Sequence, residues 1–121
     1  TNDMASVTQN AADNSDVLYV PTDNTVANNT GIVDNICHGK VPVFAGEEGI
    51  CAGCGVATLS ISYYDLGVAT GKMAVKILTG EADVSEMPIE YAPNFTKKYN
   101  ETTCADLGIT PPDGYQAISA G

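Results

Sequence analysis

The sequence contains no arginine, and its five lysines are outnumbered by fifteen acidic residues, which gives a formal net charge of −10. Such a charge repels phosphate backbones, so nucleic acid is not expected as a partner. Bidentate binding of a phosphate or carboxylate relies mainly on the arginine guanidinium group. We therefore expect any anionic group of a ligand to be held by main-chain amides, by hydroxyl groups or by residues outside this chain.

Long apolar runs are also absent. The sequence has no stretch of about 18 apolar residues, the length that a membrane-spanning helix needs. Residues 1–8 lack the basic and apolar regions of a signal peptide. Because Thr1-Asn2-Asp3 is an unusual start for a natural protein, we expect a fragment or a processed form. The 121 residues, 44% of them hydrophobic, suffice for one core and one domain. The sequence contains neither a nucleophile elbow nor a motif of serine, histidine and an acid, so it gives no indication of a hydrolase.

Three apolar segments predict the strands of a parallel sheet. Val17–Val20 is an unbroken apolar run, as in strands that are covered on both faces. Val41–Ala45 and Ala57–Ser62 are the next two, and a weaker extended segment is predicted at Met87–Tyr91. Since helical patterns alternate with these strands, we expect right-handed parallel crossovers. The predicted fold class is α/β, a three-layer parallel sheet with flanking helices.

The apolar spacing also predicts helices. The strongest pattern covers Tyr63–Leu78 and stops at Thr79-Gly80. Shorter helices are expected at Ala5–Asn14 and Glu101–Leu107, whereas Gly46–Gly49 is predicted to be a loop. One further helix, between the first two strands and ending near His38-Gly39, is predicted to bury a single face that consists of Val26, Ala27, Ile32, Val33 and Ile36.

Polar side chains follow each of the first two predicted strands. Thr22, Asp23 and Asn24 come after the first, and Glu47 and Glu48 come after the second. Ligands of open α/β sheets bind beyond the carboxyl ends of the strands, so these side chains are expected on one rim. A carboxylate there can hold an ammonium group through charge-assisted hydrogen bonds. The alternatives are helix capping for the first group and a solvated pair for the two glutamates, and capping and binding can coexist.

Three blocks of sequence, in this order, resemble one family. They are Asp16–Ala27, Pro42–Gly49, and Tyr63–Gly67 with Thr70–Leu78. They resemble the ABC-transporter substrate-binding family that includes tryptophan and tyrosine receptors, and the resemblance covers the C-terminal portion of a family member. It implies a two-lobed, periplasmic-binding-protein-like fold of type I, in which hinge strands join the lobes and the ligand lies between them.

The resemblance implies a role for each part of the chain. Residues 1–58 would belong to the C-terminal ligand-binding lobe, residues 59–86 to the hinge crossing and a helix of the other lobe, and residues 87–121 to the return crossing and the C-terminal segment. Glu48 would pair with the ammonium group of a ligand, and Asp23 and Asn24 would provide polar contacts. The expected function is non-enzymatic: to capture a small solute, an amino acid with aromatic ones among the candidates, and to deliver it to an ABC permease.

Other readings stay open from the sequence alone. A ligand-sensing domain of the same fold, without transport, fits equally well. A metal-dependent phosphoryl-transfer enzyme could use acids such as Asp23, Glu47 and Glu48, but it would need a lysine or a glycine-rich phosphate loop nearby. We expect no cofactor and no metal, and a location outside the cytoplasm, as a membrane-anchored lipoprotein or in the periplasm. A fragment with an exposed half-cleft could also form a homodimer.

The cysteines depart from the family pattern. Cys51-Ala52-Gly53-Cys54 follows the glutamate loop directly. In an exported protein we expect a small-loop disulfide between Cys51 and Cys54, with free thiols as the alternative. Zinc would need two further ligands, which Cys37 and His38 do not supply in a recognisable pattern. Cys37 and Cys104 are expected to be buried or to form a second pair.

Overall fold

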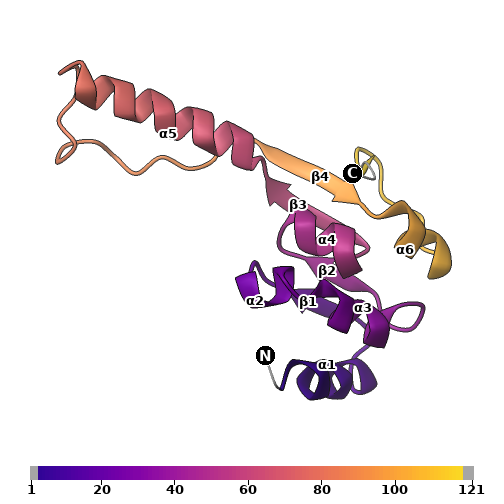
Figure 1. Ribbon diagram of the computed structural model, residues 1–121. Helices are drawn as coiled ribbons and strands as arrows, with labels where there is room; N and C mark the ends of the chain where they lie inside the picture. Colours follow the sequence, from indigo (N-terminus) through magenta and orange to yellow (C-terminus); the bar gives the residue numbers. More distant parts are fainter. Residues whose placement is uncertain (1–2, 119–121) are drawn as a thin grey trace. The chain divides into compact units, whose positions relative to one another are not determined.

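The structure, a computed structural model, describes residues 3–118 (Figure 1). Its chain divides into two compact units. The first, which we call the sheet unit, contains the residues up to Ser60 together with those from Lys97 onward, and the second, the helix unit, contains Ile61–Thr96. Among the described residues, no helix has both the length and the apolar character needed to cross a bilayer.

The strands form one sheet in the order β1-β2-β3-β4-β5. β1 and β2 pair in parallel, with Tyr19 opposite Phe44, and β2 and β3 pair in parallel, with Ala45 opposite Thr58. β4 and β5 are also parallel. These pairs confirm the parallel α/β sheet that the sequence predicts. The strand bounds are β1 Leu18–Val20, β2 Val43–Ala45, β3 Ala57–Ile61, β4 Phe95–Tyr99 and β5 Gln116–Ala117.

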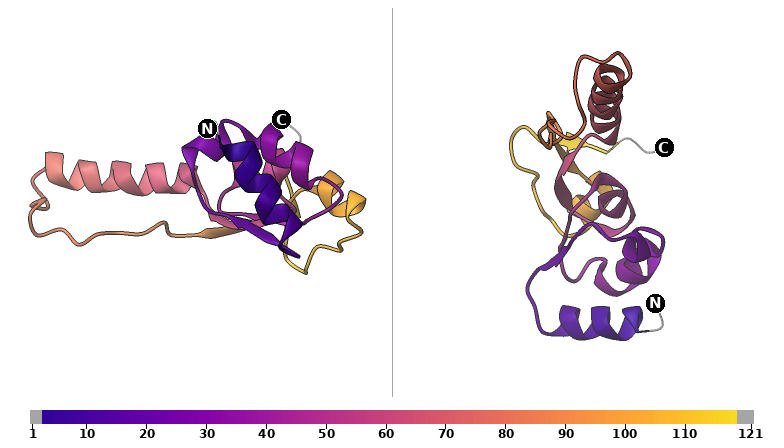
Figure 2. Two further views of the ribbon diagram at one scale, coloured as in Figure 1. Left: turned by 90° about the horizontal axis from the view of Figure 1, so that it is seen from below. Right: turned by 90° about the vertical axis from the view of Figure 1, so that its left-hand side faces the viewer.

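Five of the helices in the described part of the chain belong to the sheet unit. Figure 2 shows α3 and α4 on the same side of β1 and β2. The sixth helix, α5, lies in the helix unit and spans Tyr63–Leu78, as the sequence predicts. The bounds of the others are α1 Met4–Asp13, α2 Asn24–Ala27, α3 Thr30–Cys37, α4 Glu48–Cys54 and α6 Glu101–Asp106.

The core of the sheet unit lies between the helices and one face of the sheet. In β2, Val43 and Ala45 are buried while Phe44 between them is exposed, because successive side chains of a strand point to opposite faces. Ile50 of α4 is completely buried in the same cluster, and burying such a side chain stabilises the fold by about 1.5–3 kcal/mol. A second cluster contains Val56, Ala57 and Cys104, so the C-terminal segment completes the core.

The single helix predicted between β1 and β2 is wrong, because the structure has two helices there. The break falls at Asn28-Asn29, between α2 and α3. The backbone of Asn29 leaves the helical region, with φ −137° and ψ 31°. Its side-chain amide donates to the Thr25 carbonyl oxygen at 2.8 Å. Asparagine side chains compete in this way for backbone groups, and they favour helix ends over helix interiors.

The loop predicted at Gly46–Gly49 is wrong in its second half, because Glu48 begins α4. The carboxylate of Glu47 caps this helix, accepting hydrogen bonds from the amides of Gly49 (2.9 Å) and Ile50. Such a cap satisfies amides that have no partner in the first turn of a helix. Glycine is a poor helix former, which is why the sequence pattern did not indicate α4.

The extended segment predicted at Met87–Tyr91 forms no strand. The chain returns to the sheet unit through β4, at Phe95–Tyr99. Pro88 has no amide hydrogen to donate to a strand ladder, and Ile89 and Tyr91 are each 85% exposed. Without a neighbouring strand and without burial, the apolar residues of this segment do not form a strand.

Candidate functional site

The turns after β1 and β2 meet at one rim of the sheet unit. The Thr22 hydroxyl donates to the Gly46 carbonyl oxygen at 3.2 Å, and the Gly46 amide donates to the Val20 carbonyl oxygen at 2.8 Å. A side chain at position 46 would put its Cβ 2.6 Å from the Thr22 nitrogen, so this close approach requires glycine. The structure therefore brings together the two loops on which the sequence places the candidate residues.

Two candidate residues of the first loop lie at the start of α2. One carboxylate oxygen of Asp23 accepts a hydrogen bond from the Val26 amide at 2.9 Å and caps the helix. Asn24 is the first helical residue and is exposed, and its side chain makes no hydrogen bond to any residue in 3–118. Capping thus accounts for one oxygen of Asp23, while the amide of Asn24 stays available on the rim.

The two glutamates of the second loop have different surroundings. Both carboxylate oxygens of Glu47 are occupied in capping α4. Glu48 is partly buried, in the first turn of the same helix, where a negative charge is favourable. Within residues 3–118 its carboxylate has no hydrogen bond and no ion pair. The alternative of a solvated pair is therefore wrong for Glu47, and Glu48 is the glutamate whose carboxylate is left without a partner among the described residues.

The disulfide expected between Cys51 and Cys54 is absent, because all four cysteines are free and buried. Both residues lie in α4, and the Cys54 thiol donates to the Ile50 carbonyl oxygen at 3.4 Å. Burial raises the pKa of Cys51 to about 12 and that of Cys54 to about 11, so the thiols are protonated at neutral pH. In the described part of the chain, no three side chains of histidine, cysteine, aspartate or glutamate gather as a metal site.

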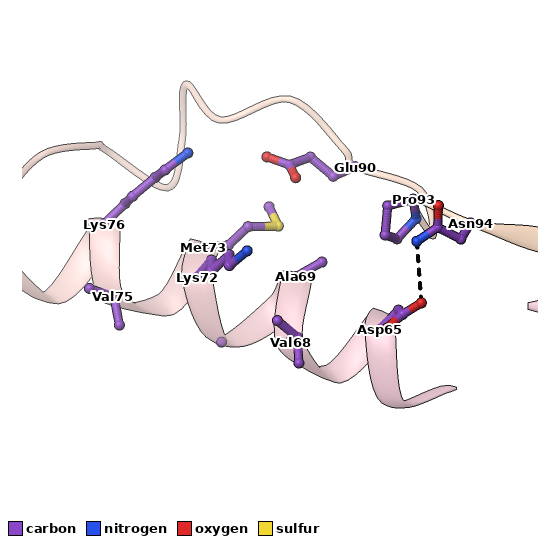
Figure 3. A pocket seen from close by; sticks show the side chains of 11 residues that line it. Asp65, Val68, Ala69, Lys72, Met73, Val75, Lys76, Glu90, Pro93 and Asn94 are labelled. Carbon is purple, nitrogen blue, oxygen red and sulfur yellow. Dashed lines mark hydrogen bonds between the residues drawn. The ribbon is translucent and has the colours of Figure 1, made fainter. Parts of the chain in front are cut away.

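A hollow lies within the helix unit, between α5 and the segment that returns toward β4 (Figure 3). Its volume is about 910 Å³. Met73 and Lys76 of α5 lie on one side and Glu90 on the other, and the Asn94 amide donates to Asp65 at 3.3 Å. No side chain of Ile61–Thr96 is fully buried, so the hollow is open and the unit has no core of its own.

Sequence reasoning did not find the hollow or the role of Gly46. The lining residues are far apart in the chain, and no spacing rule links an α5 side chain to one in the loop that follows. A hint for Gly46 was present, because a glycine directly after a strand permits close approach of another backbone.

The comparisons with known proteins decide the family. The profile of the family described as ABC transporter substrate binding protein matches residues 1–119. This chain belongs to that family. A family member named tyrosine-binding protein, from Clostridioides difficile strain R20291, is 37% identical over 95 residues, which are 78% of this chain and 27% of that protein.

Solved structures of substrate-binding proteins have the same fold. An ABC domain from Streptococcus pneumoniae in complex with L-Trp superposes with a TM-score of 0.81 at 30% identity, covering 97% of this chain and 42% of that one. The ligand-free, open structure of a substrate-binding protein with adhesive properties from Clostridium difficile gives a TM-score of 0.75 at 36% identity, covering 98% and 41%. This chain spans less than half of the length of these relatives.

Proposed function

We propose that the protein binds an amino acid at the rim formed by the turns after β1 and β2, as the solute receptor of an ABC importer. The observation that carries this proposal is the free carboxylate of Glu48 on a rim where the neighbouring acids are engaged as helix caps. A carboxylate without an internal partner can form charge-assisted hydrogen bonds with the ammonium group of a ligand. Relatives described as binding tyrosine and tryptophan support the aromatic amino acids as the first candidates.

The carboxylate group of such a ligand needs a different partner. This chain has no arginine, and the rim presents carboxylates and amides. We propose that residues outside this chain, in a second lobe, supply the hydroxyl and amide groups that bind the ligand carboxylate. Since the solved relatives are more than twice as long as this chain, there is enough additional sequence in such proteins for a second lobe.

The two units of the chain are proposed to belong to different lobes. The sheet unit would be part of the C-terminal lobe, and α5 would pack in the other lobe, with β3 and β4 as the hinge strands. The absence of any fully buried side chain in Ile61–Thr96 supports this assignment, because a helix with an apolar stripe needs a partner surface. Closure of the lobes around the solute would then mark the loaded state.

Delivery of the solute to a permease is part of the same proposal. A receptor of this family would act outside the cytoplasm, in the periplasm or held at the membrane as a lipoprotein. The measurement that separates it from a ligand-sensing protein is ATP hydrolysis by the cognate transporter in vesicles, which the loaded receptor should stimulate and a sensor should leave unchanged.

The binding site is tested in the intact protein by calorimetry with the twenty amino acids, followed by the variant Glu48→Gln. If Glu48 pairs with the ammonium group, its replacement should weaken binding by roughly 10- to 100-fold, the worth of a charged hydrogen bond. Glu81→Gln is the matched control, because it removes the same charge from an exposed loop residue. Equal affinities of the two variants would place Glu48 outside the site.

A further inference from the structure

The helix α5 carries apolar side chains on two opposite sides. On one side, Leu66 and Met73 are partly buried. Figure 3 shows Met73 pointing toward the segment that returns to β4, whereas Val68 and Val75 point away from that segment. A helix with one apolar stripe buries that stripe, and a helix that is apolar all round is usually covered all round. The side that carries the two valines therefore needs a partner of its own.

The exposed side of α5 has the spacing of a coiled-coil interface. Its residues follow one another at intervals of four, three, four and three, the pattern of heptad positions d and a, and they are Tyr64, Val68, Gly71, Val75 and Leu78. We call these five residues the α5 seam. Tyr64 is 80% exposed and Leu78 is 84% exposed, and the two valines are 40% and 57% exposed. Nothing in residues 3–118 covers this row of apolar side chains.

Gly71, in the middle of the α5 seam, has no structural role within the described chain. A glycine in a helix interior lowers stability relative to alanine. A Cβ at position 71 would meet no atom of a neighbouring element within 4 Å, so no close contact requires glycine here, in contrast to Gly46. A side chain of a second helix that packs onto position 71 would provide the missing reason, because glycine leaves room for it.

The charges beside the α5 seam select one arrangement of two α5 helices. Asp65 and Lys72 occupy the same flanking position, e, in successive heptads, and charges at this position set the orientation of coiled coils. In an antiparallel pair with Val68 packed on Gly71 of the second copy, Asp65 lies beside Lys72 of the second copy, and the pairing occurs twice. A shift by one heptad would instead place Lys72 beside Lys72, and a parallel pair would place Lys72 beside Gly67.

We propose that the α5 seam binds the same seam of a second copy of this chain, in antiparallel orientation, with Val68 against Gly71 and Asp65 against Lys72. The proposal is independent of the proposed solute site. It also leaves Leu66 and Met73, on the opposite side of α5, for the proposed second lobe. Because the seam spans only about two heptads, fewer than a long coiled coil has, the dimer should be weak, with a Kd between about 10 µM and 1 mM.

Sedimentation equilibrium of the 121-residue chain, from about 5 µM to 2 mM, tests the association. We expect a monomer at the lowest concentration and a dimer at the highest. Lys72→Glu should weaken the dimer by about tenfold or more, because it replaces two attractive pairs by two repulsive ones. The matched control is Lys76→Glu, which makes the same change of charge on the side of α5 that faces the return segment (Figure 3) and should leave the Kd unchanged. Exchanging both charges, with Asp65→Lys and Lys72→Glu together, should restore most of the affinity.

Cysteine cross-linking tests the orientation. The double variant with Tyr64→Cys and Val75→Cys should form a disulfide-linked dimer under a mild oxidant, because the two positions face each other in the proposed pair. Each single variant should stay uncross-linked, because two identical positions would lie about 16 Å apart along the helix axis. The four natural cysteines are buried and should not interfere.

A chain that stays monomeric at about 2 mM, or a dimer whose affinity is the same in Lys72→Glu and Lys76→Glu, would overturn the proposal. Both lysines are exposed, so neither change removes a core contact, and the unmutated chain decides the question of association by itself. The same measurement on a protein that also contains the proposed second lobe separates the two occupants. A dimer there supports the proposal, and a monomer would assign the α5 seam to the lobe and overturn it.

Discussion

At the scale of single residues, His38 at the end of α3 has two carboxylate partners. Its Nδ1 lies 2.9 Å from Asp34 of the same helix, and its Nε2 lies 2.8 Å from Asp106 at the end of α6. Both ring nitrogens can donate only when the imidazole is protonated. The hydrogen bonds to Asp34 and then to Asp106 raise the pKa of His38 above its ordinary value. The protonated ring therefore links α3 to α6.

The pKa of His38 can be measured directly, because it is the one histidine of the sequence. An NMR titration of its ring protons should give a pKa above the ordinary value of about 6.5. The variant Asp106→Asn should bring the pKa closer to that value, because one of the two carboxylate partners loses its charge. A pKa at or below about 6.5 in the unmutated protein would show that the two contacts do not form in solution.

The same pair of contacts predicts how stability depends on pH. Since folding raises the pKa of His38, its contribution is fully present below about pH 6.5 and is lost as the pH rises through the raised value. The difference in urea midpoint between the unmutated protein and His38→Gln should therefore be larger near pH 6 than near pH 9. A difference that grows with pH would contradict this.

At the scale of elements, the start of α4 places a capping carboxylate, that of Glu47, next to the carboxylate that we propose to bind the ligand, that of Glu48. Glu47 caps the helix, so Glu47→Ala should lower the free energy of unfolding by about 1 kcal/mol, the usual worth of a cap. Glu48→Ala removes a first-turn charge without a hydrogen-bond partner and should cost less than about 0.5 kcal/mol. Urea denaturation without ligand measures both. Equal losses, or a larger loss for Glu48→Ala, would contradict the assignment of the cap.

The elements also show what the sequence could predict. α5 was predicted with its observed bounds, because apolar residues at helical spacing along sixteen residues, followed by a stop signal, are a strong local pattern. α4 was missed because Gly49 and Gly53 weaken the pattern. Gly53 serves a tertiary contact: a side chain there would put its Cβ 2.3 Å from the Thr30 hydroxyl oxygen in α3. A contact of this kind leaves no periodic signal in the sequence.

The sequence predicted the location of the candidate site but not the role of each carboxylate in it. The position of Thr22, Asp23 and the two glutamates after neighbouring parallel strands follows from a general rule for α/β sheets, and the structure brings the two turns together. The rule does not say which carboxylate becomes a cap. That depends on where α4 begins, and the position of its first residue was not predicted.

At the scale of the whole molecule, the two units differ in whether they contain fully buried side chains. Ile50, Val43 and Cys51 are fully buried in the sheet unit, whereas no residue of Ile61–Thr96 is. Regions with few buried contacts open locally more often. In the 121-residue chain, the amides of α5 should therefore exchange with deuterium at least about tenfold faster than those of α4.

In a protein that also contains the proposed second lobe, the same α5 amides should become protected, if the helix packs in that lobe. Hydrogen exchange followed by mass spectrometry measures both proteins on the same peptides. Equal protection of α5 and α4 in the 121-residue chain would show that the helix unit is stable without further residues, and it would remove the support that its lack of burial gives to the lobe assignment.

The sheet unit is discontinuous in sequence, and this has a consequence for its synthesis. Val56 and Ala57 are covered by residues near Cys104, and β4 and β5 come from the same late part of the chain. On the ribosome, the rim that carries Glu48 is made first, but the cluster around Val56 is closed only after α5 has emerged and the C-terminal segment follows. A premature stop shortly before Lys97 would therefore leave Val56 and Ala57 uncovered without altering a single residue of the rim, and a product with such exposed apolar surface is prone to aggregate.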